Sequence, residues 1–172
     1  MTYNIHPIIV HFPIALLFIY SLIKIIPLQK WLPSIAWKDI RQVILFIGVI
    51  GAFASIITGG IAGKIVQPDK QLVEAHATFA FLTTLLYIVL MIGEISSIIN
   101  TCLSSWLERH LSIKRLLRFI EKILYNKIIS SIMAFIALIS LILTGLLGGV
   151  MVYGLSADPM AGIVLEILGI SL

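Results

Sequence analysis

The sequence predicts an all-α integral membrane protein built as a four-transmembrane-helix bundle, and three observations support this fold class. First, its 172 residues are 60% hydrophobic and only 12% charged, with a mean hydropathy of +1.12, whereas a soluble domain carries about 25% charged residues. Second, four apolar stretches each reach the roughly 20 residues that a helix needs to cross a bilayer. Third, these stretches share short motifs in a repeating order, which indicates two tandem helical hairpins.

The four predicted spans leave no room for a soluble domain, so we expect residues 1–172 to form a single membrane domain. The spans are predicted at about residues 8–28, 42–63, 75–98 and 128–152. No Lys or Arg precedes the first apolar stretch, and no small-residue cleavage site follows it. We therefore expect this stretch to be a membrane helix rather than a cleavable signal peptide.

Two further segments are predicted to lie on the membrane surface as interfacial helices. Residues 103–124 carry apolar side chains at helical spacing with charged residues between them, which is typical of an amphipathic helix at an interface. Near the C-terminus, Asp158 and Pro159 form a helix start signal, and one apolar face follows over about 159–170. We expect the first helix on the cytoplasmic surface and the second on the outer surface.

The basic residues are distributed unevenly along the chain, although the formal net charge is only +4. Ten of the twelve flank the first and third connections between spans: Lys24, Lys30, Lys38, Arg41, Arg109, Lys114, Arg115, Arg118, Lys122 and Lys127. Cations accumulate on the cytoplasmic side of membrane proteins, so we expect both termini on the periplasmic side of a bacterial inner membrane. Orienting the chain accounts for this charge without nucleic acid as a partner.

The predicted spans alternate between a histidine motif and a glycine motif. HFPIALL at 11–17 and HATFAFL at 76–82 both fit H-x-x-x-A-x-L. TGGIAG at 58–63 and TGLLGG at 144–149 both fit T-G-x-x-x-G. This order predicts a duplicated hairpin with a pseudo-twofold axis along the membrane normal.

The predicted topology brings two histidines and two glycine-rich helix ends into one layer near the outer surface. His11 and His76 lie in the first and third spans, which are diagonal in a sequential bundle. Neighbouring helix axes about 8–10 Å apart give a diagonal of about 12–14 Å, which two imidazoles can bridge through a haem iron. Small residues beside them would leave room for a porphyrin: Thr58, Gly59, Gly63, Thr144, Gly145 and Gly149.

The same residues have other uses that the sequence leaves open. A divalent metal ion could be held by His11 and His76 together with His6 and Glu74. Glycines at a spacing of four are also typical of close helix packing in lipid. His6 stands before Pro7 at the start of the first span and is about 140° around a helix from His11, so the two rings do not easily face one centre. A role for His6 beside a haem centre, by bonding a propionate or gating protons, stays open.

Other chemistries lack the residues that they need. Cys102 is the single cysteine, which excludes an internal disulfide and a C-x-x-C-H haem attachment site. The sequence has no H-E-x-x-H motif, no Ser/His/Asp pattern and no paired acids on one helix face. Hydrolytic catalysis therefore has little support.

The segment HPIIVHFPIALL at 6–17 resembles HPxxVHFPIAL, the opening signature of a bacterial membrane protein family catalogued as domain of unknown function 2231. GLLGGVMVY at 145–153 is similar to a later feature of that family, and the resemblance covers about residues 5–155. It implies a four-helix membrane module that is sometimes joined to Rieske-type or cytochrome c domains, a context that favours electron transfer. The matched positions are His6, His11 and His76, with Gly59, Gly145 and Gly149 as packing positions.

The leading hypothesis is a small b-type haem protein that passes electrons to or from a quinone or a periplasmic carrier, with His11 and His76 as iron ligands. One alternative is a protein that binds or transports zinc, copper or iron with the same histidines. Another is a non-catalytic membrane subunit whose histidines and glycines only assemble helices or recruit a partner. The lipid bilayer is a partner in each case, and a homodimer or a larger membrane complex stays open, as does enzymatic activity.

Overall fold

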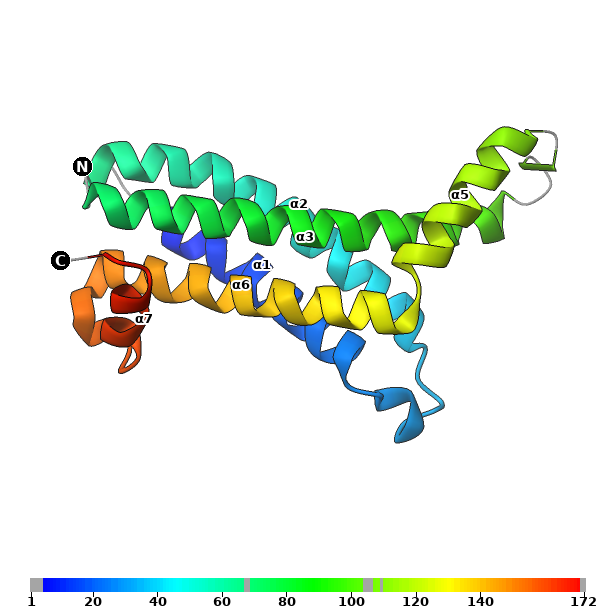
Figure 1. Ribbon diagram of the computed structural model, residues 1–172, viewed down its shortest axis with the longest axis horizontal. Helices are drawn as coiled ribbons and strands as arrows, with labels where there is room; N and C mark the ends of the chain where they lie inside the picture. The colour runs from blue at the N-terminus through cyan, green and yellow to red at the C-terminus, as the bar shows by residue number, and fades with distance from the viewer. Residues whose placement is uncertain (1–4, 67–68, 104–106, 109, 171–172) are drawn as a thin grey trace.

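The computed structural model describes residues 5–66, 69–103, 107–108 and 110–170, and within these ranges the chain is helical without any β-strand. Four long helices run side by side (Figure 1): α1 (His6–Ile25), α2 (Trp37–Val66), α3 (Lys70–Cys102) and α6 (Lys127–Tyr153). Each is long and apolar enough to cross a membrane. The predicted all-α bundle of four spans is thereby confirmed.

The four helices form two hairpins that pack against each other. α1 packs mainly against α2, and α3 packs mainly against α6. Across the two hairpins, α1 contacts α6 and α2 contacts α3, so α1 and α3 are diagonal. The start of α1 and the last helix of the chain lie at one end of the bundle, called here the terminal end (Figure 1). The opposite end, which carries the α1–α2 connection and the connection leading to α6, is called the loop end.

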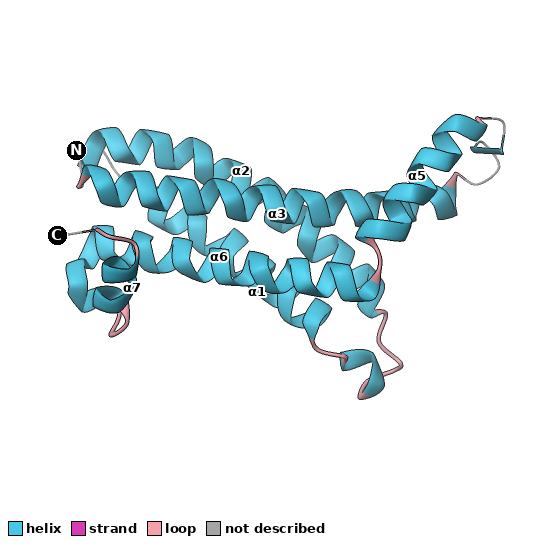
Figure 2. Cartoon of the chain, in the orientation of Figure 1, coloured by secondary structure: helices cyan, strands magenta, loops and turns pink. Residues whose placement is uncertain are grey.

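Short helices lie at both ends of the bundle, and α5 projects outward beside the end of α3 (Figure 2). At the loop end, a 3₁₀ helix spans Leu28–Lys30 and α5 (Leu111–Leu124) lies against α3, where the Asn100 side-chain amide donates to Glu121 at 2.6 Å. The structure starts α5 later than the predicted 103, because α3 itself continues to Cys102; residues 104–106 and 109 of the predicted segment lie outside the described residues.

At the terminal end, a 3₁₀ helix at Gly154–Ala157 and α7 (Ala161–Ile167) follow α6. Asp158 accepts a hydrogen bond from the Met160 backbone N–H at 2.7 Å. The helix nevertheless begins at Ala161 with Met160 as its N-cap, so the predicted start at Asp158 and Pro159 is two residues too early. The helix is shorter than the predicted 159–170 and ends before Gly169, whose φ of +69° lies in the left-handed region that favours glycine. Residues 171–172 lie outside the described residues.

The interior of the bundle is mixed rather than uniformly apolar. Its central cluster joins small and large residues from all four spans, among them Leu17, Val49, Leu90 and Ala137. A Cβ added at Gly51 would lie 3.0 Å from the Pro13 Cβ, so this glycine lets α1 approach α2 closely. Many outward-facing side chains are large and apolar, which suits contact with lipid, and the buried polar side chains gather inside the bundle.

Candidate functional site

His6 is the first residue of α1 and its ring lies against α2. The His6 Nδ1 atom is 3.0 Å from the Thr58 hydroxyl oxygen. A Cβ added at Gly59 would lie 3.1 Å from the His6 Cε1 atom, so the absence of a side chain there makes room for the imidazole. The T-G pair that opens the glycine motif of α2 therefore receives the histidine of the same hairpin.

His76 is held in a related way in the second hairpin. Its Nδ1 donates to the Thr144 backbone carbonyl on α6 at 3.0 Å. A Cβ added at Gly148 would lie 3.3 Å from the His76 Cε1 atom. His6 and His76 are near enough for their charges to interact. The terminal end thus holds two neighbouring imidazoles, one from each hairpin.

The hydrogen bonds define which nitrogen of each neutral ring carries the proton. A carbonyl oxygen only accepts, so Nδ1 of His76 is the protonated nitrogen and Nε2 carries the lone pair. The Thr58 hydroxyl donates to the Ala54 carbonyl at 3.0 Å, so its oxygen accepts from Nδ1 of His6. Both rings are therefore Nε2-acceptor tautomers, which is the form in which a histidine binds a metal while its other nitrogen is held by the protein.

His11 does not share this inward position. It is exposed, and its Nδ1 donates to the Pro7 carbonyl of its own helix. The structure therefore brings His6, rather than His11, beside His76. The physical reason is the helix period: positions five apart are about 140° apart around α1, so only one of the two can face the bundle interior.

The contacts between α1 and α3 reveal a repeat with an offset of 70 residues. The Tyr87 hydroxyl donates to the Leu17 carbonyl at 3.2 Å, and the Lys24 ammonium bonds Glu94 at 3.3 Å; each pair is 70 residues apart. His76 also lies 70 residues after His6. Residues that are equivalent in the two hairpins come together where they lie next to a pseudo-twofold axis. The pair His6 and His76 and the pair Lys24 and Glu94 therefore lie along one such axis, at opposite ends of the bundle.

A layer of hydroxyl groups lies between the two ends. Thr83 on α3 is 2.7 Å from the Ser140 hydroxyl and 3.3 Å from the Thr144 hydroxyl, both on α6. Further along α3, the Tyr87 hydroxyl accepts a bond from the Ser21 hydroxyl at 2.7 Å while it donates to α1. The Thr83 bonds join the two helices of the second hairpin, and the Tyr87 bonds join the two hairpins through α1. Both sets satisfy polar groups that lipid cannot solvate.

The loop end holds a buried ionic cluster that the sequence reasoning missed. The Glu94 side chain is 1% exposed and accepts bonds through one carboxylate oxygen from Arg41 at 2.8 Å and from Lys24 at 3.3 Å. Its other oxygen accepts from Gln42 at 3.1 Å. The sequence did carry a signal for this cluster, in the form of a polar face on α3. The residues of that face fall within about 40° of one another around the helix: His76, Thr83, Tyr87 and Glu94.

The structure does not bring together the ligands that the metal-ion alternative predicts. Glu74 is exposed and its nearest cation is Lys70, at 4.0 Å. Among the described residues, no group of three or more His, Cys, Asp or Glu side chains is arranged to hold a metal ion. The structure therefore leaves His6 and His76 as neighbouring candidate ligands, without His11 or Glu74 beside them.

The predicted glycine positions divide into packed and open ones. Gly59 contacts His6, and a Cβ at Gly149 would lie 3.6 Å from the Ala157 Cβ. Cβ atoms added at Gly63 and Gly145 would meet no described atom within 4 Å. Gly148, which the sequence reasoning did not single out, is the glycine that contacts His76. Helix packing explains Gly59 and Gly148, and a place for a cofactor beside the remaining glycines stays a prediction.

Comparison with known families covers nearly the whole bundle. The family described as predicted membrane protein (DUF2231) matches residues 2–158, a range that includes all four spans and both histidines of the terminal end. No curated protein and no solved structure matches the chain. The match agrees with the resemblance carried by residues 6–17, and the chain belongs to this family of membrane proteins.

Proposed function

We propose that this protein is a b-type haem protein of the bacterial inner membrane that transfers electrons, with His6 and His76 as the two iron ligands. The carrying observation is the pair itself: equivalent residues of the two hairpins lie near each other, and each ring is held through Nδ1 by the other helix of its own hairpin. The proposal keeps the cofactor class that the sequence predicts and replaces His11 by His6.

The chain supplies what two histidine ligands of a haem iron would require. Thr58 and the Thr144 carbonyl hold Nδ1 of the two rings, which orients each imidazole and raises its basicity at Nε2. Haem iron bound there would supply a one-electron couple. Because the histidines belong to separate hairpins, ligation would also join the two halves of the bundle.

The position of the histidine layer supports a partner on one side of the membrane. His6 is the first residue of α1 and His76 lies in the second turn of α3, both at the terminal end, and most basic residues flank the connections at the loop end. With the loop end cytoplasmic by the positive-inside rule, electrons would exchange at the periplasmic side with a quinone or a periplasmic carrier. The two hairpins expose apolar outer faces to the bilayer that carries such a quinone.

The first experiment is an absorption spectrum of the full-length protein purified in detergent from haem-supplied cells, oxidised and then reduced with dithionite. A Soret band with sharp α and β bands on reduction is expected. His6→Ala and His76→Ala should each remove the low-spin spectrum. His11→Ala is the matched control. The His11 ring is exposed on α1, five residues after His6, so its removal should leave the spectrum unchanged.

Each result separates one hypothesis from the others. Loss of the bands in His11→Ala with retention in His6→Ala would restore the original pair of His11 and His76. A haem-free protein that retains stoichiometric zinc, copper or iron on metal analysis would favour the metal-ion alternative. A protein that carries neither haem nor metal would leave the non-catalytic subunit, in which the histidines only pack helices.

A further inference from the structure

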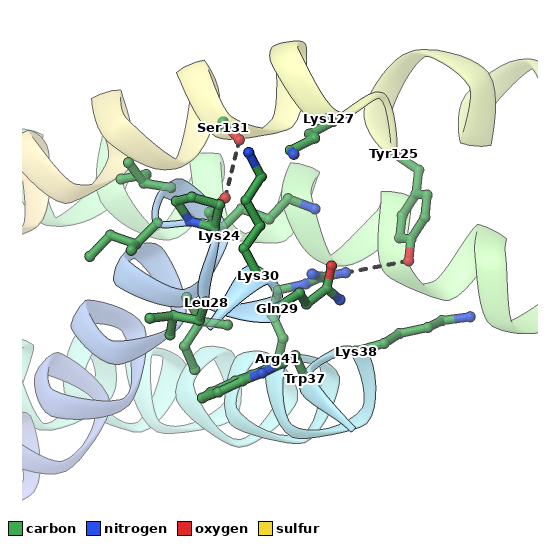
Figure 3. Close-up of a pocket in the computed structure, with 14 residues that line it drawn as sticks. Lys24, Leu28, Gln29, Lys30, Trp37, Lys38, Arg41, Tyr125, Lys127 and Ser131 are labelled. Carbon is green, nitrogen blue, oxygen red and sulfur yellow. Dashed lines mark hydrogen bonds between the residues drawn. The ribbon is translucent and has the colours of Figure 1, made fainter. Parts of the chain in front are cut away.

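A basic pocket of about 290 Å³ opens at the loop end, where the end of α1, the start of α2 and the start of α6 meet (Figure 3). The Ser131 hydroxyl donates to the Lys24 backbone carbonyl at 3.1 Å, which ties α6 to α1 at the pocket wall. Trp37 donates through its indole N–H to the Leu32 carbonyl at 2.9 Å. The first bond joins helices that are distant in the sequence, and the second fixes the connection between α1 and α2.

The lining of the pocket is strongly positive. Among the described residues, no carboxylate lines the pocket, and the cations that line it are Lys24, Lys30, Lys38, Arg41 and Lys127. Figure 3 shows that these side chains come from different elements around the same opening. Within the described part of the chain, ion pairs from this set are made by Lys24 and Arg41 alone, and both go to Glu94.

The two deepest cations share a single negative charge. The side chains of Lys24 and Arg41 are only 8% and 12% exposed, and both bond the same oxygen of Glu94. Arg41 also donates to the Tyr125 hydroxyl at 3.3 Å, and the Lys24 ammonium lies 5.1 Å from the centre of that ring. A buried cluster of two cations and one carboxylate keeps a net positive charge, which a further anion would neutralise.

We propose that this pocket binds the phosphate group of an anionic phospholipid headgroup, of the phosphatidylglycerol type. The remaining lining favours a lipid over a free anion, because apolar residues at the end of α1 border the cations: Ile23, Ile25, Ile26, Pro27 and Leu28. A pocket that joins such residues to lysines at the end of membrane spans matches a molecule with a charged head and acyl chains.

The test measures lipid binding to the full-length protein in a nonionic detergent by native mass spectrometry. Dioleoylphosphatidylglycerol and dioleoylphosphatidylcholine are titrated separately, and inorganic phosphate is then added as a competitor. We expect tighter binding of phosphatidylglycerol, weakened by added salt, and no displacement by millimolar phosphate.

The pocket variant combines Lys30→Gln, Lys38→Gln and Lys127→Gln, which leaves the buried cluster around Glu94 intact. We expect phosphatidylglycerol to bind about a hundredfold more weakly, since each lysine near an anionic lipid contributes roughly fivefold. Circular dichroism and size-exclusion chromatography check that the variant keeps its helices and remains monodisperse.

The matched control removes three positive charges from the same end of the molecule but outside the pocket, by Arg115→Gln, Arg118→Gln and Lys122→Gln on α5. It should retain most of the affinity for phosphatidylglycerol. Equal losses in the two variants, or equal binding of the two lipids, would overturn the proposal. Displacement by inorganic phosphate would overturn the lipid assignment and make the pocket a site for a soluble phosphate compound.

Discussion

The two ends of the bundle use equivalent positions of α1 and α3 in opposite ways. At the loop end the equivalent residues are Lys24 and Glu94, which carry opposite charges and bond each other. At the terminal end they are His6 and His76, which are identical and bond the helices of their own hairpins instead. The complementary pair on the axis joins the hairpins directly, whereas each residue of the identical pair bonds the other helix of its own hairpin.

This difference separates a structural task from a ligand-binding one. The charged pair needs no further component, because Arg41 and Gln42 complete the hydrogen bonds of the carboxylate. The two imidazoles have the same tautomer, and two Nε2 lone pairs cannot bond each other. Under the proposed function, Nε2 of both rings would ligate the same haem iron. The predictions below test whether the loop end carries stability and the terminal end carries function.

The largest effect is expected from Glu94→Gln at the loop end. The substitution removes the one negative charge that Lys24 and Arg41 share and leaves two buried cations without compensation. Breaking a buried ion pair in this way costs about 3–5 kcal/mol. Unfolding of the detergent-solubilised protein by heat or by a denaturing detergent should show this loss directly.

Glu74→Gln is the control for that experiment, because it removes the carboxylate of an exposed ion pair at the terminal end. The Lys70 and Glu74 side chains are 90% and 70% exposed, so the expected change is about 0.5 kcal/mol or less. Comparable losses in the two variants would contradict a special role for the loop-end cluster.

A smaller effect is expected from Tyr87→Phe, halfway along the axis. The substitution removes the hydroxyl that donates to the Leu17 carbonyl and accepts from Ser21, while the ring keeps its edge-on packing against Tyr20 at 6.1 Å between centroids. A loss of about 1 kcal/mol is expected for these bonds. Tyr153→Phe, at an exposed tyrosine, should change nothing, and an unchanged stability in Tyr87→Phe would show that the hydroxyl layer does not join the hairpins.

The spans could be predicted from the sequence because their signal is long and apolar. All four were located, although the helices extend beyond the predicted limits at several ends. α2 begins at Trp37 rather than 42 and α3 at Lys70 rather than 75, since a helix continues through polar residues once it leaves the apolar core of the membrane. Hydropathy marks the membrane core, and hydrogen bonds such as the Asp69 cap on the Leu72 N–H mark the helix end.

The register of the repeat could not be taken from motif similarity alone. H-x-x-x-A-x-L aligned His11 with His76, an offset of 65 residues, whereas the contacts give 70. Apolar helix segments resemble one another at many offsets, so a short match says little about which face is buried. Opposite charges at equivalent depth, Lys24 and Glu94, carried the better signal, because buried charges in a bilayer require a partner.

The smallest expected effect is the difference in stability between two adjacent substitutions at the terminal end, Gly59→Ala and Gly60→Ala. A Cβ at Gly59 would lie 3.1 Å from the His6 ring, whereas one at Gly60 meets no described atom within 4 Å. Gly59→Ala should displace the imidazole by a few tenths of an ångström and lengthen its bond to Thr58, at a cost of about 0.5–1 kcal/mol. Gly60→Ala should be neutral or slightly stabilising. The ¹⁵N resonances of the His6 ring should shift in the first variant and stay in place in the second; equal shifts would mean that the imidazole does not rest on α2 at this glycine.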